Sequence, residues 1–375
     1  MKKISAEIIA DSVNKQGDRI TSMVLTFPRF ILAELNTHRL FSRNSASSRA
    51  IPFKKMVEMV KTDPFIPIAW QKDHKGMQGT EYFEEPADIV EIRQEWIWGI
   101  KQAIEIATEM NELGVTKQLC NRLLEPFMWH TVILTATEFD NFFNLRCPQY
   151  YYPLSEGVQS GPFKSYIDMQ KKHVTMGLDG STETKLKINK GQSEIHMMAL
   201  AECMWNAMNE STPKQLKPGE WHIPFGDTIS DKKIRNYYLT RREDPIDIAG
   251  KSAYTQSEID NNTSYGYPSY EKYEQPLRKK IATARCARVS YLNYEGKDDY
   301  SADIKLYDRL LKSGHMSPFE HVAQCMTDDQ YHQNIKGHVD TVQETTNWKK
   351  YYPSDESLGW SRNFKGFIQL RENLE

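Results

Sequence analysis

Apolar residues recur at helical spacing over residues 88–110, where successive members lie three or four positions apart: Ile89, Ile92, Trp96, Ile100 and Ile104. This spacing puts them on one face of an α-helix, so the pattern predicts a single long helix. The helix is expected to stop before Gly114, because glycine commonly follows a helix end.

Shorter patterns predict further helices and two strands. Proline suits a first helical turn, so Pro28 is expected to open a short helix. Proline also interrupts helices, so Pro126 is expected to end another. The expected helices cover residues 28–37, 115–124, 137–146, 194–208 and 302–312. The expected strands cover residues 4–14 and 19–27, joined at Gly17 and Asp18.

These elements mix helices and strands without regular strand–helix–strand alternation, which favours an α+β fold with a sheet packed against helices. Residues 210–275 are rich in Asn, Asp, Tyr, Gly and Pro, and we expect them to be irregular. No internal repeat stands out, and no linker rich in Pro, Gly or Ser divides the chain cleanly. We therefore expect one catalytic domain over residues 1–375.

Composition limits the kinds of partner. The chain has 375 residues, 39% hydrophobic and 26% charged, with a formal net charge of -2. This is ordinary for a soluble globular protein. A net charge near zero gives no whole-molecule attraction for nucleic acid or an anionic membrane, so any anion binding is expected to be local.

The amino end and the cysteines bear on the compartment. Glu7 and Asp11 come before any apolar run of signal-peptide length, and no apolar run approaches the roughly 20 residues that span a bilayer. The five cysteines are scattered without a Cys-x-x-Cys pair, which argues against a disulfide scaffold and a thiolate metal site. We expect a cytoplasmic protein with no metal.

A basic, serine-rich stretch is the first sign of a binding site. No acidic residue occurs between Leu35 and Val57. The cations there are Arg39, Arg43, Arg49, Lys54 and Lys55, and the small polar residues between them are Ser42, Asn44, Ser45, Ser47 and Ser48. Guanidinium groups and small hydroxyls bind phosphate oxygens. Two interpretations stand at this point: an anion site, or a solvated basic loop.

Two residues suit a ligand with a heterocyclic ring. One lies beside this stretch, and the other lies at the end of a predicted helix. His38 lies beside Arg39 and either has a structural role or hydrogen-bonds a ring carbonyl or phosphate. Arg146 ends an aromatic helix face with two asparagines nearby, Asn141 and Asn144. It either recognises a planar heterocycle or interacts with the dipole of its own helix.

Several familiar sites are missing from the sequence. There is no Gly-x-Gly-x-x-Gly fingerprint and no phosphate-binding loop of Walker type. Cys147 is a poor candidate for a nucleophile, since no histidine follows it closely and nothing marks its pKa as lowered. The sequence therefore offers a candidate anion site but no obvious covalent catalyst.

Residues 38–49 resemble the signature of the flavin-dependent thymidylate synthases, His-Arg-x-x-Ser-x-Asn-x-x-Ser-x-Arg. The matching positions are His38, Arg39, Ser42, Asn44, Ser47 and Arg49. Other blocks resemble further parts of that family: 122–126, 141–146, 192–196, 287–291 and 314–321. Several independent blocks with intact internal spacing make chance similarity improbable.

The order of the blocks differs from typical members, in which the counterparts of 287–291 and 314–321 come first. The resemblance therefore implies a circular permutation of the family's fold, which is tolerated when the original termini lie close together. Residues near 55–110, 150–190 and 210–280 have no counterpart and are expected to be insertions.

The resemblance implies a role for each matched position. FAD would be bound by His38, Arg39, Ser45, Asn141 and Ser317. The nucleotide would be bound by Glu34, Thr37, Ser47, Arg49, Arg122 and Arg146, with Ser47, Arg49 and Arg122 on its phosphate. Arg146 would be catalytic, because a fixed cation at the N3 edge of the pyrimidine favours ionisation there and raises the electron density of C5.

The activity implied is methylation of dUMP to dTMP, with methylenetetrahydrofolate as one-carbon donor and NADPH as reductant. No cysteine nucleophile is needed, because the flavin cofactor carries that chemistry. The family is tetrameric with sites built from several subunits, so a homotetramer is expected. The ligand would be a pyrimidine deoxynucleotide monophosphate, with no nucleic acid or membrane partner.

Some positions depart from the family, and they keep other activities open. Thr37 replaces the first arginine of the signature, Ser45 replaces a glutamate, Thr135 stands where an asparagine often contacts flavin, and His196 stands where arginine is common. The site could instead hydroxymethylate dUMP or dCMP. A homologue that binds flavin and nucleotide without catalysis is the other alternative.

The end of the sequence, residues 360–371, resembles the tails of virus-type members. Either this segment closes over a ligand or it is a packed terminal strand or helix.

Overall fold

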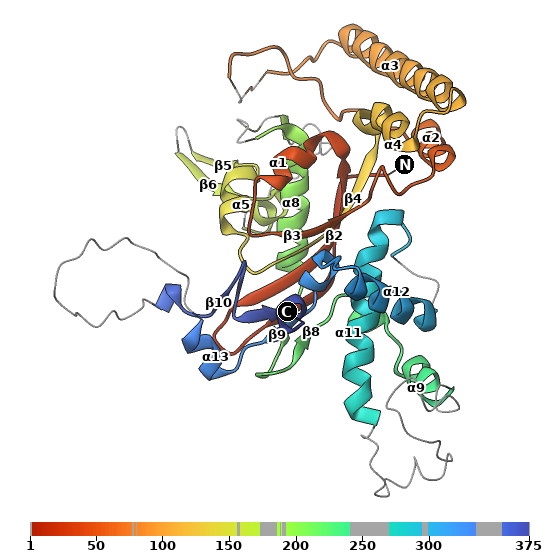
Figure 1. Ribbon diagram of the computed structural model, residues 1–375. Coiled ribbons are helices and arrows are strands. Elements are labelled where there is room, and N and C mark those ends of the chain that lie inside the picture. Colours follow the sequence, from red (N-terminus) through yellow and green to blue (C-terminus); the bar gives the residue numbers. More distant parts are fainter. Residues whose placement is uncertain are drawn as a thin grey trace, which may run out of the picture.

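A five-stranded sheet in the order β3-β4-β2-β1-β7 lies at the centre of the computed structural model (Figure 1). Its strands are β1 (Ser5–Val13), β2 (Arg19–Pro28), β3 (Ser42–Ser45), β4 (Trp129–Ala136) and β7 (Lys214–Gln215). Neighbours run antiparallel, except that β1 and β7 pair in parallel. The structure describes residues 2–76, 79, 81–155, 158–172, 186–187, 189, 193–240, 270–294, 299–334 and 355–374.

The first two strands form a hairpin because the turn between them suits glycine. Gly17 has φ 90°, in the left-handed region that glycine adopts without a Cβ penalty. The backbone N–H of Asn14 donates to the carbonyl of Asp18 at 3.0 Å and closes the turn. β2 then pairs with β4 without a break, from Thr21 opposite Ala136 to Pro28 opposite Trp129.

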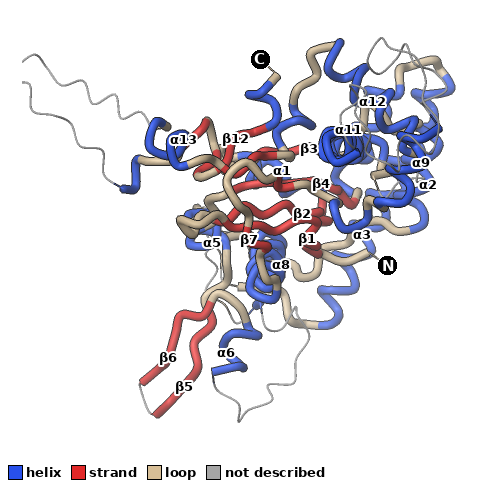
Figure 2. Tube along the Cα trace, turned by 90° about the horizontal axis from the view of Figure 1, so that it is seen from below, coloured by secondary structure: helices blue, strands red, loops and turns tan. Residues whose placement is uncertain are grey.

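One face of the sheet is covered by helices. Successive strand residues point to opposite faces, and Leu25 of β2 and Leu134 of β4 point toward this cover. The helices are α1 (Leu32–Asn36), α5 (Asp140–Arg146) and α8 (Ile195–Glu210), seen beneath the sheet in Figure 2 except for α1. α8 begins at Ile195 because the Glu194 carboxylate accepts from the backbone N–H groups of the first turn.

The opposite face is covered by a helix and a second sheet. Val24 and Ile133 pack there against Cys286 of α11 (Tyr270–Arg288). The second sheet has the order β12-β9-β8, with β8 (Trp221–His222), β9 (Ala323–Cys325) and β12 (Phe367–Gln369). Phe367 packs against Ile20 of β2, so this small sheet is part of the same core.

Three smaller units surround this layered centre. A helical unit with its own apolar core contains α2 (Phe53–Thr62), α3 (Pro86–Glu112), α4 (Lys117–Cys120) and the 3-10 helix η2 (Asn121–Phe127). A second cluster joins α11 to α9 (Asp231–Thr240), α12 (Tyr300–Lys312) and η6 (Ser317–Glu320). The hairpin β5 (Tyr150–Ser155) and β6 (Val158–Phe163) projects from the body near α6 (Tyr166–Lys172) (Figure 2).

The remaining elements are short. They are η1 (Arg29–Ile31), η3 (Gly226–Thr228), η5 (Val289–Tyr291), α13 (Asp328–Gln333), η7 (Asp355–Ser357), β10 (Trp360–Ser361), β11 (Phe364–Lys365) and η8 (Leu370–Asn373). Within the part of the chain that the structure describes, no helix combines the length and apolarity needed to cross a bilayer.

Several expected elements are confirmed. The strands expected over 4–14 and 19–27 are β1 and β2, and the helices expected over 88–110, 194–208 and 302–312 are α3, α8 and α12. The helix expected from Pro28 begins as the 3-10 turn η1 before α1. The fold is mixed α and β, with sheets packed against helices.

Other expectations were wrong. Of the region 210–275 that was expected to be irregular, residues 241–269 lie outside the described residues, while the described parts contain β7, β8, α9 and the start of α11. The composition misled for α9 because its polar residues lie on the exposed side of an amphipathic helix. The helix expected over 115–124 is α4 followed by η2, and Pro126 lies inside η2 rather than after it. The helix expected from Thr137 begins at Asp140, since β4 continues to Ala136.

The carboxyl-terminal segment is packed into the fold. Phe364 and Phe367 have no exposed surface, and β12 is bonded along β9. Of the two interpretations of residues 360–371, the structure agrees with the packed terminal segment.

Gly366 shows how closely this segment approaches the first hairpin. Its φ of 77° favours glycine, and a Cβ there would lie 2.7 Å from Oδ2 of Asp18. Gly17 has a similar φ but open space around it, which makes it a matched control. Gly366→Ala is expected to lower the free energy of unfolding by about 1–3 kcal/mol more than Gly17→Ala, measured by urea denaturation. Equal losses would contradict the close packing.

Buried histidines predict an acid-sensitive fold. Burial lowers the pKa of His130, His222 and His321 to about 3 each. In the unfolded chain these histidines have a pKa near 6.5. Below that pH the unfolded chain therefore binds protons that the folded chain does not bind. The free energy of unfolding is therefore unaffected by these histidines above about pH 6.5. Between about pH 6.5 and pH 3 it falls as the pH is lowered, by about 1.4 kcal/mol per pH unit for each histidine.

Urea unfolding between pH 5.5 and 7.5 measures this slope. His315→Gln, at an exposed position, is expected to keep the wild-type slope. A stability that does not change over this interval would contradict the burial of neutral histidines.

Candidate functional site

Residues 37–49, called the signature loop below, are not one irregular loop. β3 lies within them and pairs with β4 from Ser42 opposite Thr135 to Ser45 opposite Val132. A polar strand such as Ser-Arg-Asn-Ser is stable here because its backbone is paired and its side chains find tertiary partners. The strand gives the two ends of the signature loop fixed positions on the sheet.

Arg43 does not belong to the anion site that the basic stretch predicts. Its Nη1 donates to the carbonyls of Leu35 and His38, at 2.9 and 3.4 Å. These carbonyls close the turn at the end of α1, so Arg43 holds that turn against β3. Burial lowers its pKa, as expected for a half-buried guanidinium.

At one end of β3, three residues from distant parts of the sequence meet; we call them the His38 cluster. Nε of Arg146 donates to Nε2 of His38 at 3.2 Å, and Nη1 of Arg146 donates to Oγ of Ser193 at 3.1 Å. Arg146 closes α5, and Ser193 precedes α8. Arg146 therefore does more than interact with its own helix dipole.

The ring of His38 is neutral in this arrangement. Burial, and after it the charges of Arg146 and Arg43, lower the pKa of His38 to about 4. Phe142 packs edge-on against the ring at 4.9 Å, and Phe41 lies stacked on it at 5.8 Å. Because Nε2 accepts the bond from Arg146, the proton of the neutral ring sits on Nδ1.

The other end of the signature loop is held through its backbone carbonyls. Nδ2 of Asn121 donates to the carbonyls of Ser48 and Ile51, at 2.7 and 3.1 Å. Nζ of Lys117 donates to the carbonyl of Ala50 at 3.1 Å. These bonds join the segment that carries Arg122 to the segment that carries Arg49.

The late sequence blocks also reach the signature loop. Oγ of Ser290 donates to the carbonyl of Ser45 at 3.4 Å, and the N–H of Ser47 donates to the carbonyl of Ser290 at 3.1 Å. Ser317 begins η6, which packs against β3. The blocks 287–291 and 314–321 therefore lie beside the signature although they follow it by more than two hundred residues.

Two residues of this neighbourhood were not predicted. Nδ2 of Asn363 donates to the carbonyl of Leu40 at 3.1 Å and to Oγ of Ser42 at 3.0 Å. Nε2 of Gln369 also donates to Oγ of Ser42, at 3.1 Å, and Gln369 is buried. The resemblance of residues 360–371 to family tails was the available signal, but it gave no partner for them.

The hydrogen bonds that hold the signature loop leave several side chains unused that were predicted to bind ligands. Among the described residues, Arg39, Arg49 and Asn141 are exposed and have no hydrogen-bond or ion-pair partner. Arg122 is 56% exposed, and Glu125 lies 3.9 Å from it. The guanidinium groups of Arg39 and Arg49 are therefore available to an anion, and that of Arg122 is largely exposed.

Glu34 and Thr37, both assigned to the nucleotide by the resemblance, lie in and just after α1. The hydroxyl of Thr37 donates to the carbonyl of Glu34 at 2.7 Å, so it is used within the turn. Oε2 of Glu34 is buried and has no hydrogen-bond partner among the described residues. Thr37, which replaces the first arginine of the signature, brings no positive charge to this turn. The carboxylate of Glu34 can therefore accept a hydrogen bond from another donor.

The predicted residues form two groups at opposite ends of β3. His38 and Arg146 are at one end, and Ser47, Arg49 and Arg122 belong to the other. A four-residue strand spans about 10 Å. The predicted base contact and the predicted phosphate contacts therefore lie at different ends of the strand.

Two other candidates have structural roles. Cys147 is buried, and burial raises the pKa of its thiol, which removes it as a nucleophile at neutral pH. His196 is buried, with Nδ1 2.5 Å from Oε1 of Glu194 and Nε2 accepting from the N–H of Ile68 at 3.0 Å. In the described part of the chain, no three His, Cys, Asp or Glu side chains are grouped to hold a metal ion.

No family model and no curated protein sequence matches the chain. Among solved structures, a UMP/dUMP methylase, PolB from Streptomyces cacaoi, bound with 5-Br dUMP, is 12% identical with a TM-score of 0.36. That alignment covers 56% of this chain and 91% of the other. The same methylase bound with 5-Br UMP is 14% identical with a TM-score of 0.33, over 40% and 79% of the chains. At these TM-scores the likeness carries no inference about function.

The contact between His38 and Arg146 can be tested by titration. Arg146→Gln is expected to raise the pKa of His38 by roughly 0.5–1 unit, because a neighbouring positive charge disfavours a second one. The value should stay below 6.5, since burial is the larger cause of the shift. Proton NMR of the histidine rings measures it.

Arg93→Gln, on the exposed side of α3, is the matched control and should leave His38 at its wild-type pKa. An unshifted His38 in Arg146→Gln would rule out the contact.

Proposed function

We propose that the chain is a flavin-dependent enzyme that transfers a one-carbon unit to C5 of a pyrimidine deoxynucleotide monophosphate, with dUMP as substrate and dTMP as product. The observation that carries the proposal is the bond between Arg146 and His38. It joins two blocks that the sequence resemblance assigns to substrate and flavin, 108 positions apart.

The role of Arg146 follows from its hydrogen bonds. Nε and Nη1 are held by His38 and Ser193, which fixes the plane of the guanidinium. The remaining N–H groups of the fork are available to the N3 edge of a pyrimidine. A fixed positive charge there stabilises negative charge on the ring, which raises the electron density of C5 before bond formation.

The phosphate is assigned to Ser47, Arg49 and Arg122. Their backbone is anchored by Asn121 and Ser290, while both guanidinium groups remain exposed. An anchored backbone with exposed cations favours phosphate binding, since little conformational freedom is lost when the ligand binds.

The residues assigned to FAD fit an anionic dinucleotide chemically. Arg39 supplies an unpaired cation, and His38, Ser45, Asn141 and Ser317 supply neutral hydrogen-bonding groups. When bound, the flavin would mediate delivery of the one-carbon unit from methylenetetrahydrofolate, with NADPH as reductant. The chain itself would bind, orient and exclude water; Cys147 is not required.

The family resemblance implies a homotetramer with shared sites. In this arrangement a nucleotide would take its base contact from Arg146 of one subunit and its phosphate contacts from Arg49 and Arg122 of another. This is the arrangement that the family resemblance implies.

The unpartnered carboxylate oxygen of Glu34 favours a second candidate, the modification of dCMP. A carboxylate accepts a hydrogen bond from the exocyclic amino group of cytosine. The missing cation at Thr37 also keeps a hydroxymethyl product open for either base. The alternative without catalysis would bind flavin and nucleotide but release no product.

Product mass spectrometry tests the proposal. Purified protein with FAD, methylenetetrahydrofolate and NADPH is incubated with dUMP or with dCMP. A product of dUMP heavier by one CH2 is expected, and one heavier by CH2O would assign the hydroxymethyl variant. Conversion of dCMP would favour the role of Glu34. No product from either nucleotide would contradict the enzymatic proposal.

Arg146→Ala is expected to lower turnover by at least about a hundredfold while FAD remains bound, because it removes the charge that stabilises the reacting ring. Flavin absorbance after gel filtration reports the bound cofactor. Arg93→Ala on α3 is the control and should keep wild-type turnover. Full activity in Arg146→Ala would exclude the catalytic assignment.

A further inference from the structure

A chain of five polar side chains crosses the buried face of the central sheet. Oγ of Ser12 lies 3.0 Å from Nδ1 of His222, and Nε2 of His222 lies 2.8 Å from Oγ of Ser22. Oγ of Ser22 lies 2.6 Å from Oγ1 of Thr135, which lies 2.8 Å from Nδ1 of His321. The chain therefore runs over β1, β8, β2, β4 and the residue after η6.

Every member of this chain is buried. Ser22, Thr135, His222 and His321 have no exposed surface, and Ser12 is 4% exposed. Burial lowers the pKa of both histidines to about 3, so both rings are neutral near pH 7. A neutral imidazole has one N–H donor and one acceptor nitrogen, and a hydroxyl has one proton to donate.

These donor counts allow only two complete sets of hydrogen bonds. If Nδ1 carries the proton in both rings, every bond points from His321 toward Ser12. If Nε2 carries it in both rings, every bond points from Ser12 toward His321. If the two rings carry different tautomers, the hydroxyl oxygens of Ser22 and Thr135 have either no proton between them or two protons that compete for the same contact. Either arrangement costs free energy in a buried site.

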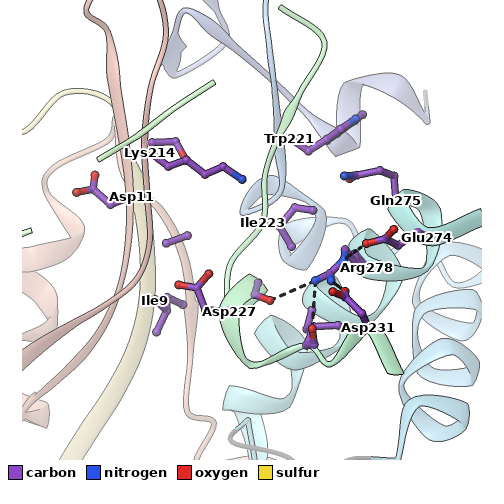
Figure 3. A pocket seen from close by; sticks show the side chains of 14 residues that line it. Ile9, Asp11, Lys214, Trp221, Ile223, Asp227, Asp231, Glu274, Gln275 and Arg278 are labelled. Carbon is purple, nitrogen blue, oxygen red and sulfur yellow. Dashed lines mark hydrogen bonds and ion pairs between the residues drawn. The ribbon is translucent and has the colours of Figure 1, made fainter. Parts of the chain in front are cut away.

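The two ends of the chain face different surroundings. Ser12 helps to line a pocket of about 490 Å³, shown in Figure 3, together with Lys214, Trp221, Asp227 and Arg278 among others. At the other end, Nε2 of His321 is buried and has no hydrogen-bond partner among the described residues. His321 directly follows η6, which packs against the signature loop at β3.

We propose that Ser12, His222, Ser22, Thr135 and His321 form one two-state hydrogen-bond relay that couples the pocket at Ser12 to Nε2 of His321. A pocket ligand that accepts from Ser12 favours the Nδ1 state and leaves Nε2 of His321 as an acceptor. A ligand that donates to Ser12 favours the Nε2 state and makes the same nitrogen a donor. The relay does not depend on the proposed enzymatic activity.

Without a ligand the Nδ1 state is expected. It leaves the hydroxyl proton of Ser12, a pocket-lining residue, free to donate, and leaves only an acceptor unsatisfied at His321. The Nε2 state would leave a buried N–H without an acceptor, which folded proteins rarely tolerate.

Long-range proton–nitrogen NMR of protein labelled at histidine nitrogens identifies each tautomer near pH 7.5. Both His222 and His321 are expected in the Nδ1 form in the wild type, assigned with His222→Gln and His321→Gln. Different tautomers in the two rings, or a protonated ring, would overturn the relay.

Ser12→Ala tests the coupling from a distance. It removes the acceptor of His222, so each state then leaves one buried N–H unpaired and both states become populated. His222 and His321 are expected to show equal Nε2 populations, although His321 lies beyond Ser22 and Thr135. A change in the tautomer population of His222 without an equal change in that of His321, or no change in either population, would overturn the proposal.

Two further proteins make the result specific. Thr131→Val removes another buried hydroxyl of β4 outside the chain, and both rings should keep their wild-type tautomer. The double variant Ser12→Ala with Thr135→Val is compared with Thr135→Val alone. The Nε2 tautomer population of His222 is expected to differ between the two proteins, while that of His321 is expected to stay the same. If His321 still follows His222, Thr135 is not part of the relay.

Discussion

β4 is paired along both of its edges, with β2 over its full length and with β3 at its far half, and the other layers are placed by this pairing. The alternation of strand residues sends Leu134 toward the helices on one face and Thr135 toward the polar chain on the other. A slip of one residue would exchange these faces. The apolar cover, the buried histidines and the signature loop therefore depend on one register.

The signature loop is fixed mainly through its backbone. Side chains from three distant segments donate to its carbonyls or to Ser42, which leaves its arginines free of internal partners among the described residues. The exception is Arg43, whose guanidinium donates to backbone carbonyls of the turn after α1. The bonds that hold this stretch therefore do not use the charges of Arg39 and Arg49. Arg146 follows the same logic, since His38 and Ser193 fix its plane and leave part of its fork available.

Elements with a strong local pattern could be predicted from the sequence, and α3 and α8 are examples. β3 could not, because a Ser-Arg-Asn-Ser strand has no apolar alternation and is stabilised by β4, far along the chain. The importance of His38 and Arg146 was predicted, but their contact was not, since no local pattern encodes a pairing across 108 residues. Asn363 and Gln369 were missed for the same reason. Of the relay residues, Ser12 and Ser22 lie in strands that were expected, whereas His222 lies in the region expected to be irregular, where the polar composition gave no sign of the short strand β8.

Binding of both ligands to one site is the central claim, and the absorbance spectrum of bound flavin measures it most directly. Protein loaded with FAD is titrated with dUMP, and the flavin band is followed in the wild type and in Arg49→Ala. The account predicts a saturable change of the flavin spectrum in the wild type, and a change that needs at least about tenfold more dUMP in Arg49→Ala, because a phosphate contact is lost. A protein that retains no FAD, or a flavin spectrum that dUMP and dCMP both leave unchanged, would contradict it.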